Sequence, residues 1–125
     1  DAGAPATWWD GRPFDAILLD APCSASGIVR RHPDIRWLRR PEDSAKLARQ
    51  SARILDNLWQ LLKPGGKLLL VTCSLWPEES AQQADAFAVR HPAIRLQAPG
   101  QLLPVVTTDS DQDGLFYALF QKPSV

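Results

Sequence analysis

Residues 15–24 read Asp-Ala-Ile-Leu-Leu-Asp-Ala-Pro-Cys-Ser, and residues 67–74 read Lys-Leu-Leu-Leu-Val-Thr-Cys-Ser. Each stretch holds a short run of consecutive apolar residues, which is typical of a strand buried on both faces of a parallel sheet. Each run ends on a cysteine motif, Asp20-Ala21-Pro22-Cys23-Ser24 in the first and Thr72-Cys73-Ser74 in the second. Open α/β sheets place their chemistry beyond the carboxyl ends of parallel strands. The sequence therefore predicts an α/β fold in which the two thiols converge on one crevice.

The segment between the two runs predicts a crossover helix. From Pro41 onward, apolar residues recur at spacings of three and four, and Lys63-Pro64-Gly65-Gly66 ends the pattern. Residues 24–40 contain Gly27, Pro33 and several arginines without a sustained period, so we predict a long functional loop there. A strand, a crossover helix and a parallel strand together form a βαβ unit.

A second helix and a final strand follow. The helix begins near Pro77, with Glu78 and Glu79 in its first turn, and ends at His91-Pro92. The side chains that it presents inward are predicted to be Ala81, Ala84, Phe87 and Ala88. A weak strand is expected at residues 94–97, a loop at 98–113 and a strongly apolar strand at 114–121.

The composition limits the class of protein. A chain of 125 residues with 45% hydrophobic residues has the size and the apolar content of one domain with its own core. Fourteen basic residues balance fourteen acidic ones, so no overall positive field attracts nucleic acid, although a local field is possible. No apolar run approaches the ~18 residues of a membrane span, and no signal peptide is recognisable. We therefore predict a soluble, cytoplasmic protein without a membrane partner.

No metal site is predicted. Cys23 and Cys73 match no zinc-binding spacing, and cytoplasmic thiols are usually reduced, so two free thiols are favoured over a structural disulfide. The run Asp109, Asp111 and Asp113 alternates like the ligands of a calcium loop, but the downstream glutamate is absent.

Each cysteine motif has a functional and a structural interpretation. Asp20 and Cys23 place a hydrogen-bond acceptor and a thiol at a strand end, where they could hold a heteroaromatic ring by its amino group. Alternatively, Cys23 is a small core residue and Asp20 a cap. Cys73 precedes the helix expected near Trp76, whose N-terminus would lower the thiol pKa and favour a nucleophilic thiolate. Alternatively, Cys73 is buried and inert. The presence of two such strand ends favours function.

The chain closely resembles the carboxyl-terminal half of bacterial 16S rRNA cytosine-C5 methyltransferases of the RsmB (Sun/Fmu) type, which are related to the NOP2/NSUN family. The resemblance covers essentially all of the chain. It rests on five motifs in matching order and spacing, namely residues 20–27, residues 30–34, Lys63-Pro64-Gly65-Gly66, Thr72-Cys73-Ser74 with Pro77-Glu78-Glu79, and Asp113-Gly114-Leu115-Phe116.

The resemblance implies a role for each site residue. Cys73 would be the nucleophile that adds to C6 of the target cytosine, so that C5 accepts a methyl group from S-adenosylmethionine. Cys23 would assist the elimination that releases the methylated RNA. Asp20 would contact both the cofactor and the base, and Asp1 would lie near the adenine of the cofactor.

The implied fold is the second half of a Rossmann-like class I methyltransferase sheet, with parallel strands at 16–20 and 67–72 and an antiparallel final strand at 114–121. The chain contains no methionine and opens on the loop-like residues 1–10, which suggests a piece of a larger domain. The family's glycine-rich cofactor loop and its N-terminal RNA-binding domain have no counterpart here. We therefore expect residues 1–125 alone to be inactive or weakly active, and to form a homodimer through the exposed edge of the first strand.

A local excess of arginine predicts an RNA contact. Arg30, Arg31, His32 and Arg36, followed by Arg39 and Arg40, are opposed nearby only by Asp34. In this interpretation the basic residues contact phosphates and Trp37 offers a stacking face. The alternative is a solvated loop with Trp37 in the core. Packing is the role predicted for the other tryptophans, Trp8, Trp9, Trp59 and Trp76.

Three functions compete on these observations. The first is an RNA cytosine-C5 methyltransferase that uses Cys73, Cys23 and Asp20, with 16S rRNA as its partner. The second is a DNA cytosine-C5 methyltransferase with Cys23 as the nucleophile, in which Thr72-Cys73-Ser74 would have no role. The third is a non-catalytic RNA-binding or assembly module, whose binding would survive loss of both thiols.

Overall fold

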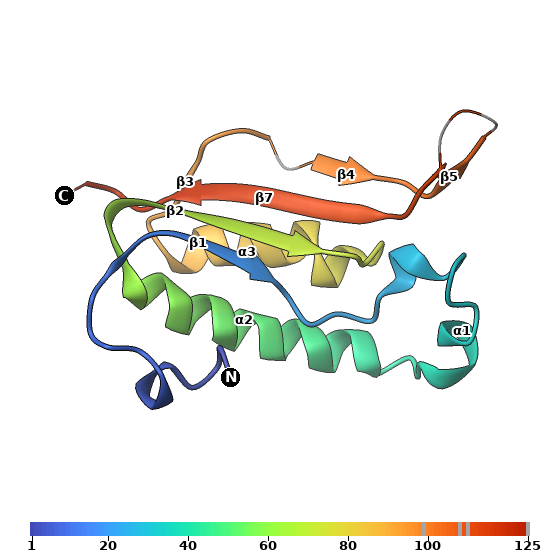
Figure 1. Ribbon diagram of the computed structural model, residues 1–125, viewed down its shortest axis with the longest axis horizontal. Coiled ribbons are helices and arrows are strands. Elements are labelled where there is room, and N and C mark those ends of the chain that lie inside the picture. Colours follow the sequence, from blue (N-terminus) through green and yellow to red (C-terminus); the bar gives the residue numbers. More distant parts are fainter. Residues whose placement is uncertain (99, 108, 110, 125) are drawn as a thin grey trace.

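The sheet is built around β2 (Leu62–Thr72), in a computed structural model that describes residues 1–98, 100–107, 109 and 111–124 (Figure 1). β1 (Phe14–Asp20) lies on one side of β2 and β7 (Leu115–Gln121) on the other. The far side of β7 pairs with two short strands, β3 (Ile94–Arg95) and β4 (Gly100–Leu102).

The strand directions agree with the predicted fold. β1 runs parallel to β2, with Leu18 opposite Leu69 and Asp20 opposite Val71. β7 runs antiparallel to β2, with Ala118 opposite Leu70. Because β1 and β2 are parallel and end in register, the segments that carry Cys23 and Cys73 leave the sheet at the same edge.

Two helices cover one face of the sheet. α2 (Asp43–Leu61) and α3 (Ala81–Arg90) lie side by side beneath the strands (Figure 1). Both helices were expected, and their apolar faces form the core with the strands. The ring of Phe87 contacts those of Trp59 and Phe120 edge-on, with centroids 5.2 and 5.0 Å apart. Ala81, predicted to point inward, is exposed because α3 begins there.

The two strands predicted to be buried on both faces are not. From Gly66 to Thr72 of β2 every second residue is buried, including Leu68 and Leu70, while Leu69 between them is half-buried. In β1, Leu18 is 67% exposed. In the described part of the chain the helices cover only one face, and β1 is an edge strand, so its apolar run lacks the second layer that the pattern predicted.

The two predicted loops contain short regular elements. Residues 24–40 include a 3-10 turn, η2 (Ser26–Ile28), and a one-turn helix, α1 (Ile35–Leu38). Residues 98–113 include β4 and a small hairpin of β5 (Val105–Val106) and β6 (Asp111–Gln112). These elements are too short to leave a period in the sequence. Residues 99, 108 and 110 of the second predicted loop lie outside the described residues.

Two further 3-10 turns complete the fold, η1 (Pro5–Thr7) before β1 and η3 (Pro77–Glu79) between β2 and α3. Among the described residues, no helix has both the length and the apolar character needed to cross a membrane.

Candidate active site

The two cysteines come together at the carboxyl ends of β1 and β2. Cys23 lies on the loop that follows β1, and Cys73 comes directly after β2. Their Sγ atoms are 3.4 Å apart, both thiols are free, and both are half-buried. The predicted convergence of the two thiols is therefore confirmed.

The contact between the two sulfur atoms shifts the two thiol pKa values in opposite directions. The pKa of Cys23 is lowered to about 7, above all because its thiolate accepts a hydrogen bond from Cys73, and burial only partly opposes this effect. The pKa of Cys73 is raised, first by the same hydrogen bond, then by burial and by the negative charges of Cys23 and Asp20. A thiolate that accepts a hydrogen bond is stabilised, and the thiol that donates it holds its proton more tightly.

The expected lowering of the Cys73 pKa by a helix N-terminus is wrong. The helical segment after Cys73 is only the 3-10 turn η3, and α3 begins later, at Ala81. A single turn carries little of the dipole of a full helix.

Gly27 joins three loops behind the thiols. Its N–H donates to the Cys73 carbonyl at 2.7 Å, and its carbonyl accepts from the Gly114 N–H at 2.7 Å. A Cβ at position 27 would lie 2.5 Å from the Gly114 oxygen and 2.6 Å from the Cys73 oxygen. Only glycine allows this approach, which fixes the Cys23 loop against the ends of β2 and β7.

The side chain of Glu79 hydrogen-bonds to both cysteine loops. Its side chain is 2% exposed. One carboxylate oxygen accepts from the Ser24 N–H, and the other accepts from the Ser24 hydroxyl, each at 2.7 Å. The second oxygen also accepts from the Ser74 hydroxyl. A buried carboxylate with several donors holds those donors in fixed positions.

Sequence reasoning missed this role, because Glu79 was assigned to the first turn of a helix for its dipole. The available signal was the serine that directly follows each cysteine, Ser24 and Ser74.

The two predicted cofactor residues lie in different surroundings. Asp20 is the last residue of β1, is exposed, and lies close enough to Cys73 for its charge to raise that thiol's pKa. Asp1 lies beside α2, where its carboxylate accepts from the Gly3 N–H at 2.8 Å. It lines a cavity of about 160 Å³ together with Gln50, Arg53 and Asn57.

The predicted RNA-binding residues divide into two groups. Arg30 pairs with Asp111 at 2.5 Å, and Arg31 pairs with Asp113 at 2.6 Å. The Arg31–Asp113 contact raises the pKa of Arg31 and lowers that of Asp113. Asp34 is the only acidic residue within this arginine-rich segment, and the structure adds two acidic partners from the segment before β7.

His32 and Arg36 are exposed, and the described residues contain no ion-pair partner for either. Trp37 is 85% exposed, so the alternative that placed it in the core is wrong. The packing role holds for Trp59, which is 2% exposed, and for half-buried Trp9, which packs against the core. Trp8 is 45% exposed, but its ring packs against Phe14 with centroids 6.4 Å apart. The role fails for Trp76, which is 52% exposed.

Comparison with known proteins matches this chain to a known family. The profile of the family described as 16S rRNA methyltransferase RsmB/F matches residues 1–121. The ribosomal RNA small subunit methyltransferase B of Vibrio vulnificus is 50% identical to this chain, over 98% of the chain and 29% of that protein. The chain thus spans less than a third of the length of this relative.

Two crystal structures from Pyrococcus horikoshii share the fold. A methyltransferase homologue superposes with a TM-score of 0.73 at 25% identity, over 98% of this chain and 43% of that one. NSun6 with SFG superposes with a TM-score of 0.74 at 24% identity, over 98% of this chain and 33% of that one.

Proposed function

The chain belongs to the RsmB/F family of 16S rRNA methyltransferases, and from this membership we propose that it carries the catalytic thiols of an RNA cytosine-C5 methyltransferase that acts on 16S rRNA in the cytoplasm. The observation that carries the proposal is the 3.4 Å contact between Cys23 and Cys73 beside Asp20, at the carboxyl ends of two parallel strands.

In the first step, Cys73 is the nucleophile. Its sulfur forms a bond to C6 of the cytosine, and the electron pair of the C5–C6 double bond moves toward C5, which becomes nucleophilic. Covalent addition divides one difficult substitution into easier steps. Cys73 must lose its proton in this step, and Cys23 lies at hydrogen-bond distance to receive it. The lowered pKa of Cys23 and the raised pKa of Cys73 suit a thiolate base beside a thiol donor.

In the last step, Cys23 acts a second time. Cys23 first releases its proton to water and becomes a thiolate. This thiolate then removes the proton from C5. The bond between Cys73 and C6 breaks, and the C5–C6 double bond forms again. The Cys73 sulfur leaves as a thiolate, and the proton on Cys23 restores the initial charge of the pair.

S-adenosylmethionine, when bound, supplies the electrophilic methyl group. Asp1 and Asp20 fit such a cofactor chemically, since carboxylates accept hydrogen bonds from ammonium and exocyclic amino groups. The cavity beside Asp1, about 160 Å³, is smaller than the ~300–1,000 Å³ of pockets that enclose whole ligands. We infer that Asp1 holds one end of the cofactor, that Asp20 lies between cofactor and base, and that the 125-residue chain alone binds the cofactor weakly.

The RNA contact is proposed for Arg30, Arg31, His32 and Arg36. Arg36 and His32 are available for phosphates as they stand. Arg30 and Arg31 would exchange the carboxylates of Asp111 and Asp113 for phosphates of the RNA.

One observation favours a different assignment. The lowered pKa of Cys23 fits Cys23 itself as the nucleophile, the arrangement expected for a DNA cytosine-C5 methyltransferase. In that case Cys73 would serve only as a hydrogen-bond donor, and its removal would slow the reaction without abolishing it.

Methyl transfer tests the proposal directly. The full-length protein that carries this chain is incubated with 16S rRNA and S-adenosylmethionine labelled in its methyl group, and the modified nucleoside is identified by mass spectrometry. We expect 5-methylcytosine with the native protein and none with Cys73→Ala. Methylation of DNA but not RNA, or RNA binding without methylation in the native protein, would contradict the proposal.

A further inference from the structure

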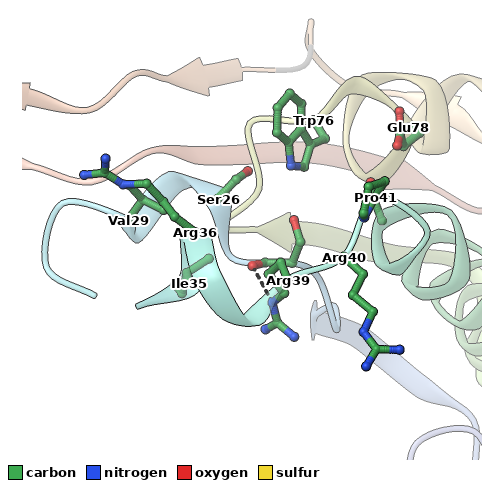
Figure 2. Close-up of a pocket in the computed structure, with 11 residues that line it drawn as sticks. Ser26, Val29, Ile35, Arg36, Arg39, Arg40, Pro41, Trp76 and Glu78 are labelled. Atoms are coloured by element: carbon green, nitrogen blue, oxygen red, sulfur yellow. Dashed lines mark hydrogen bonds between the residues drawn. The ribbon is translucent and has the colours of Figure 1, made fainter. Parts of the chain in front are cut away.

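A groove lies beside the thiol loops and has no role in the steps above. Its volume is about 580 Å³, within the range of ligand pockets. Trp76 and Glu78 lie on one side of it, and Arg39 and Arg40 on the opposite side (Figure 2). Ser24, the neighbour of Cys23, also lines the groove, so the groove adjoins the candidate active site.

One buried hydroxyl in the groove lacks a partner. Ser44 is 7% exposed, and its Oγ has no hydrogen-bond partner in the described part of the chain. Buried polar atoms are nearly always paired, because an unpaired one loses its interaction with water without replacement. Since Ser44 lines the groove, a ligand with a polar group would supply the missing hydrogen bond.

The groove also offers an aromatic face. The indole of Trp76 is 52% exposed, although it follows the buried end of β2. The apolar side chains of Val29, Ile35 and Pro41 line the same groove. Exposed aromatic side chains beside apolar surface stack with nucleic acid bases, largely without regard to base identity.

The charges of the groove favour an anion. Three arginines line it, namely Arg36, Arg39 and Arg40, against the carboxylate of Glu78. Arg39 donates to the Ser24 carbonyl at 3.1 Å, which fixes that wall. Arg36 and Arg40, unlike Arg30 and Arg31, have no ion-pair partner among the described residues. Unpaired guanidinium groups are suited to phosphate.

We propose that this groove binds the nucleotide next to the target cytosine in single-stranded RNA. Its base stacks on Trp76, its phosphate lies against Arg36 and Arg40, and the Ser44 hydroxyl bonds to its ribose or base edge. The proposal rests on the proposed function, because that function places the target cytosine at Cys23. The groove adjoins Cys23 through Ser24. A single strand fits better than a duplex, since paired and stacked bases do not expose a face to an indole.

The test measures the affinity of the full-length protein for the 16S rRNA fragment that it methylates, by fluorescence anisotropy. We expect Trp76→Ala to weaken binding by about 5- to 150-fold, the range for loss of one stacked base. Trp8→Ala is the matched control, because Trp8 is 45% exposed but precedes β1, away from the groove. It should leave the affinity unchanged.

Ser44→Ala separates binding from folding. The hydroxyl is unpaired in the free protein, so its removal should leave the melting temperature unchanged or raise it, while RNA affinity falls by roughly 2- to 12-fold. Arg40→Gln should reduce the slope of log affinity against log salt by about 0.7. Arg12→Gln, which removes the same charge before β1, should not change the slope.

A double-mutant cycle identifies the nucleotide. RNA that lacks the base at one position next to the target should bind the native protein as weakly as intact RNA binds Trp76→Ala. When the abasic RNA and Trp76→Ala are combined, the affinity should fall no further. Full additivity at both neighbouring positions, or native affinity in both Trp76→Ala and Ser44→Ala, would overturn the groove proposal.

Formation of the covalent adduct with the same RNA is measured alongside the affinities. If the groove variants lose affinity as expected but Cys73→Ala still forms the adduct, the proposed function fails and the groove remains an RNA site.

Discussion

The Cys23 and Cys73 sulfur atoms lie 3.4 Å apart, within hydrogen-bond distance, so the ionisation of each thiol affects the other. When Cys23 is the thiolate it accepts a hydrogen bond from the Cys73 thiol, which lowers the pKa of Cys23 to about 7 and raises that of Cys73. A lone thiol has a pKa of about 8.5. The pair therefore holds a thiolate near neutral pH that neither cysteine would hold alone.

This predicts the pH dependence of alkylation. Iodoacetamide reacts with the thiolate, so the rate of Cys23 modification should rise with pH to a midpoint near 7. In Cys73→Ala the hydrogen bond that stabilises the thiolate is lost, so the midpoint should move upward, toward about 8.5. Mass spectrometry of the modified peptide measures both midpoints. An unchanged midpoint in Cys73→Ala would mean that the contact does not set the pKa.

Part of the site follows from the sequence. The Asp20-Ala21-Pro22-Cys23 and Thr72-Cys73-Ser74 motifs end predicted parallel strands, so their convergence could be predicted from topology alone. The hydrogen bonds of Glu79 could not, because they depend on two loops that approach from different strands. The same limit applies to Arg30 and Arg31, whose acidic partners lie far along the chain.

The elements themselves are tied together at Gly27. The loop after β1, the end of β2 and the turn before β7 meet there at backbone hydrogen bonds of 2.7 Å. The two thiols owe their contact to this junction, since it holds the Cys23 loop directly against the Cys73 carbonyl.

A methyl group at this junction should separate the loops. In Gly27→Ala the added Cβ meets backbone oxygens at 2.5 and 2.6 Å, so the loops must shift. We expect the free energy of unfolding to fall by about 1–3 kcal/mol in urea denaturation, and the Cys23 alkylation midpoint to rise. Gly3→Ala is the control, because the nearest atom to its Cβ is a side-chain oxygen at 3.2 Å. Equal effects of the two substitutions would contradict the assigned role of Gly27.

The length of each helix or strand determined whether the sequence could predict it. The 19-residue helix α2 repeats its apolar face over five turns and was predictable, as were the strongly apolar β2 and β7. The short strands β3 and β4 are set by pairing with β7, and the two-residue strands β5 and β6 pair with each other. Such pairing leaves no local period.

The molecule as a whole is asymmetric, because α2 and α3 cover one face of the sheet and β1 forms its edge (Figure 1). Leu18 is 67% exposed on this strand. A groove of about 310 Å³ runs beside it, lined by apolar residues that include Trp8 and Phe14. An open strand edge beside apolar surface promotes pairing with another chain.

We therefore expect the isolated 125-residue chain to associate in solution. Leu18→Lys should shift it toward the monomer in light scattering, because a lysine on an edge strand opposes pairing. Val89→Lys is the control, since Val89 is 86% exposed on α3, away from the edge. A native chain that is monomeric at all concentrations, or a Val89→Lys variant that dissociates equally, would exclude association through β1.

We propose that Cys73 attacks the base and that Cys23 releases it. The most direct test of this proposal is the covalent protein–RNA adduct, measured on a denaturing gel with the full-length protein, 16S rRNA and S-adenosylmethionine. Cys73→Ala should form no adduct and no methylated RNA. In Cys23→Ala the hydrogen bond and the charge that raise the pKa of Cys73 are gone, so Cys73 loses its proton to water and still adds to the base. The adduct should then accumulate, because elimination is blocked. An adduct with Cys73→Ala and none with Cys23→Ala would exclude Cys73 as the attacking thiol and assign the nucleophile to Cys23.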